Sequence, residues 1–339
     1  HVVFNHDKDI LTQNGTTIPT LELKSHISQE HLSRYENFIR HKQPILCQNS
    51  LNEVPQFVVT SWMERLILNR LESKTERVFA ELEQTKGDWE EVFYRIILKY
   101  FGMKVNGDAM IDLAHILPIS IIRKESNSLT KVEALFFGQA GFLNEMESTD
   151  VYGQELRSEY MYLKQKYQLY TMKAAQWRFS KLRPPNFPTI RLAQLSVLFA
   201  TNQYLFQSIK DKINYTDLCQ LLDVKPSEYW ENHYQFGTLS KTKTSNRIGT
   251  MLLHNIVINV IVPIAFAYGQ SIGDESYKEY ALDLLQNTKP EENTITKSWK
   301  SIGLHMNSAQ ETQASIELYT NYCAHKKCLQ CQIGNFLLK

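Results

Sequence analysis

The sequence has few cysteines, little net charge and no long uninterrupted hydrophobic run. Five cysteines in 339 residues are too few for the disulfide framework of a secreted domain and fit a reducing cytoplasm better. A net charge of +1 gives no reason to expect a cationic surface over the whole molecule. The longest apolar run, residues 251–268, contains His254 and Pro263, which favours a buried helix over a membrane span. We therefore expect a soluble, cytoplasmic protein that does not contact a membrane.

The motifs of the common enzyme classes are also missing. The chain has no phosphate-binding loop, no dinucleotide fingerprint, no His-Glu-x-x-His zinc motif and no nucleophile elbow. The composition is nevertheless that of a folded protein, with 43% hydrophobic and 22% charged residues, and the length suggests about two domains. Function must therefore be inferred from local groups of residues.

Most of the chain has the hydrophobic periodicity of helices. We predict a mainly α protein in which an N-terminal β-hairpin precedes an irregular multi-helix body. The hairpin is predicted from two apolar runs, Val2–Phe4 and Ile18–Leu23, separated by the turn dipeptide Asn14-Gly15. Because two strands alone are marginally stable and the chain starts without Met, we expect them to be the remnant of a sheet whose other strands lie upstream of His1.

A proline-rich break separates the predicted helices most clearly. Pro184, Pro185 and Pro188 lack amide donors and restrict the residues before them, so we place a domain boundary there. The predicted domains are 1–27 (the β-hairpin, as the end of an N-terminal α/β domain), 28–182 (a helical subdomain) and 183–339 (a helical subdomain with a C-terminal cysteine cluster). Helices are predicted at residues 108–116, 129–142, 153–170, 189–208, 215–222, 245–268, 275–285 and 309–323.

Three of the cysteines lie close together near the C-terminal end of the sequence. Cys323, Cys328 and Cys331 form a Cys-x4-Cys-x2-Cys cluster, and thiolates so spaced can bind one soft or borderline metal ion. A fourth ligand must come from elsewhere, and the candidates are Cys47, His325 and Cys219. We expect a structural zinc or iron–sulfur site rather than a redox centre. The alternative is a set of buried, unreactive thiols that pack like small apolar residues.

Acidic residues are absent from residues 160–210, where basic and aromatic residues alternate. Such a segment suits contact with nucleic-acid phosphates and stacking on unpaired bases. Alternatively, the aromatic side chains fill the core and the cations form a solvated face. The predicted nucleic-acid-binding residues are Lys164, Lys166, Lys173, Arg178, Lys181, Arg183 and Arg191.

A short loop within this segment holds two arginines between prolines. Arg183 and Arg191 flank a stiff stretch that enters a helix at Thr189, which could cap it. Arginine on such a loop suits phosphate or carboxylate. The same residues could equally tie a structural loop to the ends of helices.

The N-terminal strands carry a weak catalytic pattern. Asp7 follows the first strand, and Glu22 and Lys24 share a face at the end of the second. An acid next to Glu-x-Lys is how many nucleases hold Mg²⁺. The alternative is an ordinary exposed strand end.

Several strings taken together resemble an uncharacterised bacterial family, chiefly of Bacteroidetes, known as domain of unknown function 2851. They are His-Val-Val-x-x-His-Asp at residue 1, Ile-Pro-Thr-Leu-Glu-Leu at 18, Trp-Met-Glu-Arg-Leu at 62, Phe-Gly-Gln-Ala-Gly-Phe-Leu at 137, Arg-Pro-x-Asn-x-Pro-x-x-Arg-Leu at 183 and Cys-x4-Cys-x2-Cys-x-Ile-Gly at 323. The resemblance covers the whole chain, and the family has no established activity.

The resemblance implies that a segment is missing before His1. Members begin earlier, with Gly-Pro-Asp and Val-Glu-x-His strings that look like a nuclease core. The acidic residues that would bind Mg²⁺ would then lie upstream of this chain. Some nucleases of that kind close their fold with a cluster held by one distant and three C-terminal cysteines, which resembles Cys47 with Cys323, Cys328 and Cys331. That cluster brackets the nuclease core, whereas Cys47 follows the strands.

Two functions follow as hypotheses. The first is the C-terminal helical part of a nucleic-acid-processing, nuclease-like protein with a structural metal site, inactive as this fragment. The second is a non-catalytic helical scaffold or binding protein stabilised by zinc or an iron–sulfur cluster. We expect Arg183 and Arg191 to line an open groove in the first and to be satisfied inside the helical body in the second.

Overall fold

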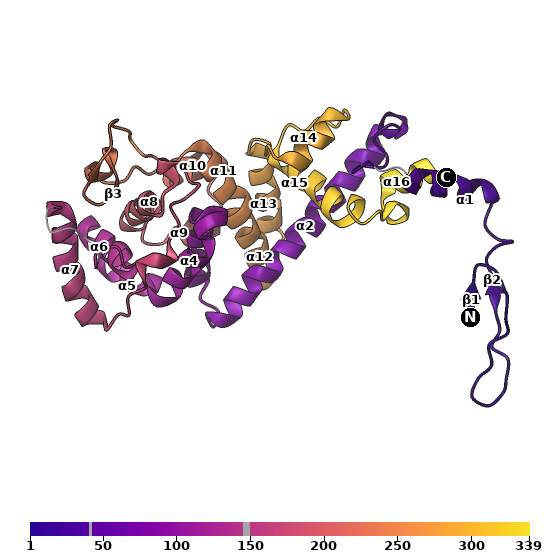
Figure 1. The fold of residues 1–339 in the computed structure, drawn as a ribbon, viewed down its shortest axis with the longest axis horizontal. Helices are drawn as coiled ribbons and strands as arrows, with labels where there is room; N and C mark the ends of the chain where they lie inside the picture. The colour runs from indigo at the N-terminus through magenta and orange to yellow at the C-terminus, as the bar shows by residue number, and fades with distance from the viewer. Residues whose placement is uncertain (41–42, 145–149) are drawn as a thin grey trace. The chain divides into compact units, whose positions relative to one another are not determined.

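Helices form most of the described chain, as the sequence predicted (Figure 1). A computed structural model describes residues 1–40, 43–144 and 150–339. The chain divides into two compact units. The first comprises His1–Arg70, Pro290–Asn307 and Glu311–Lys339, and the second comprises Leu71–Lys289 and Ser308–Gln310. The division falls within one helix, α2 (Gln56–Gln84).

The N-terminal strands of the first unit run parallel, so the predicted hairpin between them is wrong. β1 (Val2–Val3) pairs with β2 (Leu21–Glu22) in a parallel register. The Asn14-Gly15 turn does form, and it closes a smaller antiparallel bridge between Leu11 and Thr17. Because this turn already reverses the chain once, a second reversal between the strands brings β1 and β2 into the same direction.

The rest of the first unit is mainly helical. Trp299 is fully buried, and its indole N–H donates to the Ser315 carbonyl at 3.0 Å. Arg70 on α2 donates through Nε to Gln313 at 2.6 Å. These contacts join segments far apart in the sequence. The helices are α1 (Gln29–Arg40), η1 (Leu51–Glu53), the first part of α2, α14 (Thr294–Ser301), α15 (Ala309–Leu318), η6 (Tyr319–Cys323), η7 (Cys328–Gln330) and α16 (Gln332–Leu338).

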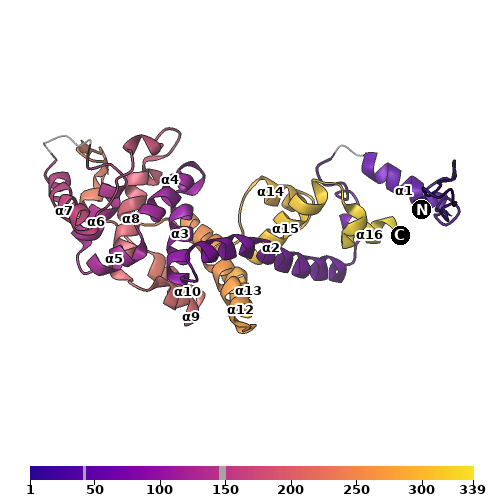
Figure 2. The same cartoon turned by 90° about the horizontal axis from the view of Figure 1, so that it is seen from below.

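The second unit is built from helices, which Figure 2 shows from below. Their apolar side chains form a large buried core. Local signals start several of them; the Asp88 side chain, for example, accepts hydrogen bonds from the amides of Glu90 and Glu91. The helices are α3 (Trp89–Phe101), α4 (Met103–Ile116), α5 (Ile119–Glu125), α6 (Leu129–Gln139), α7 (Val151–Tyr167), η2 (Ala174–Gln176), η3 (Pro184–Asn186), α8 (Pro188–Thr201), α9 (Leu205–Lys210), α10 (Tyr215–Leu222), η4 (Glu228–Glu231), α11 (Thr250–Ile256), η5 (Val257–Ile261), α12 (Val262–Ile272) and α13 (Ser276–Asn287). The strands β3 (His233–Gln235) and β4 (Thr238–Leu239) form an antiparallel pair.

The most apolar helical stretch lies in the core of this unit. Among the described residues, one continuous helical span, Thr250–Ile272, is long enough and apolar enough to cross a membrane. The bent pair formed by Met103–Ile116 and Ile119–Glu125 passes the same test when its two helices are taken together. However, 72% of the most apolar window of Thr250–Ile272 is buried within the fold. The prediction of a buried helix at residues 251–268 is therefore confirmed.

Two predicted boundaries differ from the structure. The helix expected at residues 189–208 is interrupted after Thr201, where the Asn202 side chain donates to the Leu198 carbonyl, and it resumes as α9. The domain boundary expected at residue 183 falls inside the second unit. The prolines there open α8 and do not divide the fold, because Pro188 takes the first helical position.

Candidate functional site

The structure brings Cys47 to the C-terminal cysteine cluster. Cys47, Cys323, Cys328 and Cys331 line one cavity of about 20 Å³ in the first unit, which we call the cysteine cavity. Cys47 lies in a turn before η1, Cys323 ends η6, Cys328 begins η7 and Cys331 precedes α16. The four thiols therefore come from segments at opposite ends of the described sequence.

Close backbone packing shapes this cavity. A Cβ on Gly334, in α16, would lie 2.4 Å from the Cys328 carbonyl oxygen, so only glycine allows the chain to pass there. Lys326 adopts a left-handed conformation with φ of 51°, and its ammonium donates to the Ile39 carbonyl at 3.2 Å. Arg34 of α1 likewise donates to the carbonyl of Lys339. The cluster is thus held against α1.

The thiols influence one another electrostatically. Burial raises the pKa of Cys47 to about 12, and the charges that Cys331 and Cys328 would carry as thiolates add to this effect. Burial likewise raises the pKa of Cys328 to about 11, with a further contribution from Cys331. The pKa of Cys323 is also raised by burial and by the other three cysteines. Without a cation the thiols are therefore protonated, and a metal ion that bound them would displace their protons.

Hydrogen-bond donors surround one of the sulfur atoms. Burial raises the pKa of Cys331, but the backbone amides of Gly334 and Ile333 and the indole of Trp62 act in the opposite direction. The Trp62 indole N–H has no other hydrogen-bond acceptor among the described residues. Donors of this kind stabilise a thiolate and commonly support metal-bound sulfur. Trp62 also packs edge-on against Tyr322, at 5.3 Å between ring centroids.

The sulfur atoms share the cysteine cavity without already enclosing a metal position. Within the described ranges, no group of three or more His, Cys, Asp or Glu side chains is arranged to hold a metal ion. A four-thiolate site would therefore require the cysteine side chains to reorient. The other two candidate ligands are not brought to the cavity: His325 is exposed, and Cys219 lies on α10 in the second unit beside Tyr215.

The predicted catalytic residues of the strands are not brought together. In the part of the chain that the structure describes, no hydrogen bond or ion pair joins Asp7, Glu22 and Lys24. The Lys24 ammonium instead donates to Asn5 at 3.3 Å. Asp7 and Lys24 are exposed, and Glu22 is half-buried. This arrangement is that of an exposed strand end.

The acid-free segment divides between core and surface. Its aromatic side chains include Tyr160 and Trp177, which are buried and donate to Gln139 and the Ala140 carbonyl. Lys166 forms an ion pair with buried Glu125 at 2.6 Å. Lys164 is half-buried, whereas Lys173, Arg178, Lys181 and Arg183 are exposed.

Arg191 is buried, as the scaffold hypothesis expects and the nuclease-like hypothesis does not. Its guanidinium donates to Gln194 at 2.7 Å and to Asn186 at 2.6 Å. Thr189 does not cap α8 as expected, because Phe187 precedes the helix; Thr189 donates to the Tyr234 carbonyl. The two arginines of the loop therefore lie in different environments.

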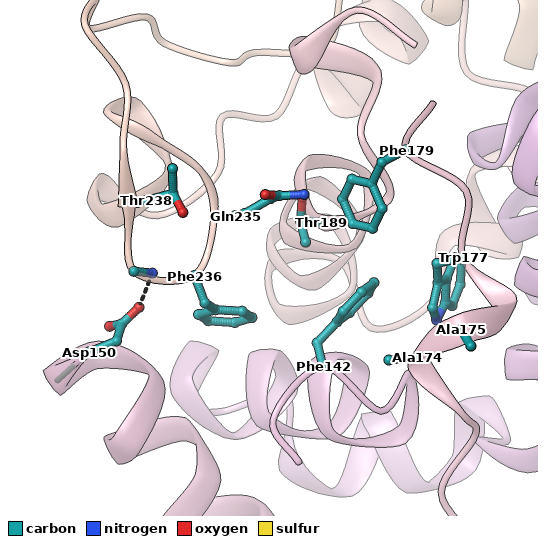
Figure 3. Close-up of a pocket in the computed structure, with 11 residues that line it drawn as sticks. Phe142, Asp150, Ala174, Ala175, Trp177, Phe179, Thr189, Gln235, Phe236 and Thr238 are labelled. Atoms are coloured by element: carbon teal, nitrogen blue, oxygen red, sulfur yellow. Dashed lines mark hydrogen bonds between the residues drawn. The ribbon is translucent and has the colours of Figure 1, made fainter. Parts of the chain in front are cut away.

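Sequence reasoning missed an aromatic cavity of about 530 Å³ in the second unit. Figure 3 shows Phe142, Phe179 and Phe236 directed toward the same space, with Asp150 at one side. The Asp150 carboxylate accepts hydrogen bonds from the amides of Gly153 and Gly237, so it is already occupied. The string Phe-Gly-Gln-Ala-Gly-Phe at residue 137 ends at Phe142, which lines this cavity.

Comparison with protein families gives one match. The model of a family described as a protein of unknown function (DUF2851) matches residues 1–294. The matched range includes Cys47 and ends before Cys323. Comparisons with curated proteins and with solved structures found no match.

Proposed function

Because the chain belongs to the DUF2851 family, whose function is unknown, we propose a function from its own geometry: a helical binding protein whose first unit is stabilised by one metal ion. The ligands are Cys47, Cys323, Cys328 and Cys331. The ion ties the segment before η1 to the segment between α15 and α16. This role is structural and assigns no reaction to the chain.

One observation carries this proposal: four of the five cysteines line a single cavity. Cys47 is far from the trio in sequence, so nothing in the local chain requires it to be there. Buried thiols that only fill space have no reason to gather at one point. Four thiolates supply the complete ligand set of a structural zinc site.

The size of the cavity favours a single ion over a cluster. Its volume of about 20 Å³ compares with the roughly 10–15 Å³ that one water requires. A cluster of several iron and sulfide ions needs more space than that. Zinc with four thiolates at about 2.3 Å is therefore the first expectation.

The position of Arg191 supports a binding protein over the nuclease-like alternative. The non-catalytic hypothesis expects the loop arginines inside the helical body, and Arg191 lies there, with both terminal nitrogens hydrogen-bonded to amide side chains. Arg183 remains exposed, so binding of single-stranded nucleic acid through the exposed cations stays a prediction.

Metal analysis of protein purified without oxygen tests this proposal. We expect about one zinc per chain, and loss of most of it in Cys47→Ser and in Cys323→Ser, because three thiolates hold zinc more weakly than four. Measurement by plasma mass spectrometry gives the metal-to-protein ratio. One iron–sulfur cluster per chain would support the site and correct the identity of the metal.

Two variants serve as matched controls. Cys219→Ser removes a thiol of the second unit, and His325→Ala removes an exposed candidate ligand near the cluster. Both should retain the full metal content. Absence of zinc and iron from the unmodified protein, or full metal content in Cys47→Ser, would refute the proposal.

A further inference from the structure

A second cavity in the second unit is lined by four cations. Its volume is about 550 Å³, and Lys99, Lys104, Arg191 and Arg247 all contribute to its wall. None of its lining residues is acidic. We call it the cationic cavity. The size falls within the roughly 300–1,000 Å³ of small-molecule sites.

Arg191 is the buried cation of this cavity. Only 6% of the residue is exposed, yet within residues 1–40, 43–144 and 150–339 no carboxylate pairs with it. Its two terminal nitrogens donate to the neutral amides of Gln194 and Asn186. Its Nε is buried with no partner at all in the described chain. Burial lowers the pKa of Arg191 to about 10, which reflects the cost of a buried charge without a counter-ion.

The other cations leave the cavity positive. Burial lowers the pKa of Lys99, and the nearby charge of Arg77 lowers it further, although Asp108 and Glu81 act in the opposite direction. Lys104 is exposed. Arg247 pairs with Asp223 at 3.0 Å, but both side chains are largely exposed. A concave site with charge of one sign concentrates the field on a ligand of the other sign.

Methionines form an apolar part of the same cavity. Met251 is 82% exposed and Met103 is 42% exposed, although large apolar side chains are normally covered. Met103 also has φ of 53°, a conformation that costs energy in a residue other than glycine. Its sulfur lies 3.9 Å from Nη2 of Arg191. The strained residue therefore places a flexible apolar side chain next to the buried cation.

We propose that the cationic cavity binds a small organic anion. Its phosphate or carboxylate group pairs with Arg191, and its apolar body lies against Met103 and Met251. This site is independent of the cysteine cavity, because every residue that lines it belongs to the second unit. It therefore goes beyond the proposed metal-stabilised role.

The burial of Arg191 argues against a polynucleotide as the occupant. A nucleic-acid backbone is contacted by exposed side chains along an open groove. Arg191 is instead buried in the wall of a cavity that Tyr100 and Leu252 also line. A compact ligand can bring its charged group to this point.

Calorimetric titration of the full chain at low salt tests the proposal with matched probes. Phenyl phosphate, benzoate and benzyl alcohol each contain one phenyl ring. The first carries a phosphate, the second a carboxylate and the third no charge. We expect phenyl phosphate or benzoate to bind and benzyl alcohol not to bind. The anion that binds more tightly identifies whether the site is built for a phosphate or for a carboxylate. We expect Arg191→Met to lower the affinity for that anion about tenfold or more, since a charge-assisted hydrogen bond is lost.

Further variants separate binding from folding. Lys104→Gln and Arg247→Gln change exposed residues and should lower the affinity for the anion a few-fold without unfolding the protein. They therefore remain informative if Arg191→Met does not fold. Lys173→Gln, an exposed cation outside the cavity, should bind like the unmodified protein. The proposal is overturned if neither anion binds, if Lys104→Gln and Arg247→Gln leave affinity unchanged, or if only a single-stranded oligonucleotide binds.

Discussion

Glu125 shows how one buried carboxylate organises the cations around it. The residue is 2% exposed and lies at the end of α5. Lys166 and Lys131 pair with its two oxygens at 2.6 and 3.2 Å, and the Tyr167 hydroxyl donates to it as well. Burial alone would raise the pKa of Glu125, but these hydrogen bonds outweigh it and lower the pKa to about 2. Part of the acid-free segment is therefore committed to internal pairing.

This pairing predicts a dependence of stability on pH. The folded pKa of about 2 lies below the value of roughly 4.3 for an unfolded glutamate. The ionised Glu125 side chain therefore contributes its full stabilisation above roughly pH 4.3, and this stabilisation is lost as pH falls toward 2. Glu125→Gln should lower the free energy of unfolding by about 2 kcal/mol at neutral pH. Urea denaturation at a series of pH values should show that this difference shrinks between about pH 5 and 2.

An exposed pair provides the control for this measurement. Glu275 pairs with Lys278 at 2.6 Å but is largely exposed, so Glu275→Gln should change stability little at any pH. A constant difference between Glu125→Gln and the unmodified protein across the whole pH range would contradict the assignment.

Residue type predicted which cysteines lie together better than it predicted burial. The thiol chemistry of Cys323, Cys328 and Cys331 made a fourth cysteine worth seeking, and Cys47 does line the same cavity. Nothing in the local sequence distinguishes Arg191, which is buried, from Arg183, which is exposed. That difference depends on the helices that pack around α8, and these come from distant parts of the chain.

At the scale of elements, α6 and α7 pack at the closest distance that glycine permits. A Cβ on Gly138 of α6 would lie 2.2 Å from the ring of Tyr160 on α7. Tyr160 is fully buried, and its hydroxyl donates to Gln139 at 3.1 Å. The ring therefore cannot move aside without losing this bond.

Gly138→Ala should consequently destabilise the protein. Alanine is favoured over glycine inside a helix by about 1 kcal/mol, but overpacking costs typically about 1–3 kcal/mol, and here the neighbour is a buried ring. We expect a net loss of about 2 kcal/mol in urea-induced unfolding. Gly249→Ala is the control, because a Cβ there meets nothing within 4 Å. Equal stability of the two variants would show that the helices can separate freely.

Elements with strong local signals were predicted well, and those that depend on pairing were not. The expected helices at residues 108–116 and 215–222 correspond to α4 and α10, because apolar periodicity fixes them locally. The parallel register of β1 and β2 was missed, since a turn dipeptide specifies only the reversal at its own position. The antiparallel pair of β3 and β4 has strands too short for a periodic pattern.

At the scale of the molecule, the first unit is discontinuous in sequence, whereas the second is nearly continuous. The predicted domains were continuous because composition and proline breaks are read along the chain. Contacts such as Arg70 with Gln313 link residues 243 apart and leave no local trace. This is why the predicted subdomains and the two compact units differ.

Removal of the proposed metal should affect the two units differently. A chelator that strips the cysteine cavity should speed amide hydrogen exchange about tenfold or more in residues 43–50 and 323–334. Residues 129–139 of the second unit should exchange at an unchanged rate. Exchange measured by mass spectrometry with and without chelator checks this. No change near the cysteines, or equal acceleration in both units, would contradict a metal confined to the first unit.

The separation of the cysteines along the chain has a consequence for biosynthesis. Lys326 contacts Ile39 beside the cysteine cavity, and these residues are 287 positions apart. A ribosome adding about 5–20 residues per second needs roughly 15–60 seconds to cover that distance. During this interval Cys47 is exposed without its partners, and the second unit, synthesised in between, can fold first. The first unit can therefore close only after the segment around Lys326 has been made, when all residues of the second unit have already been synthesised.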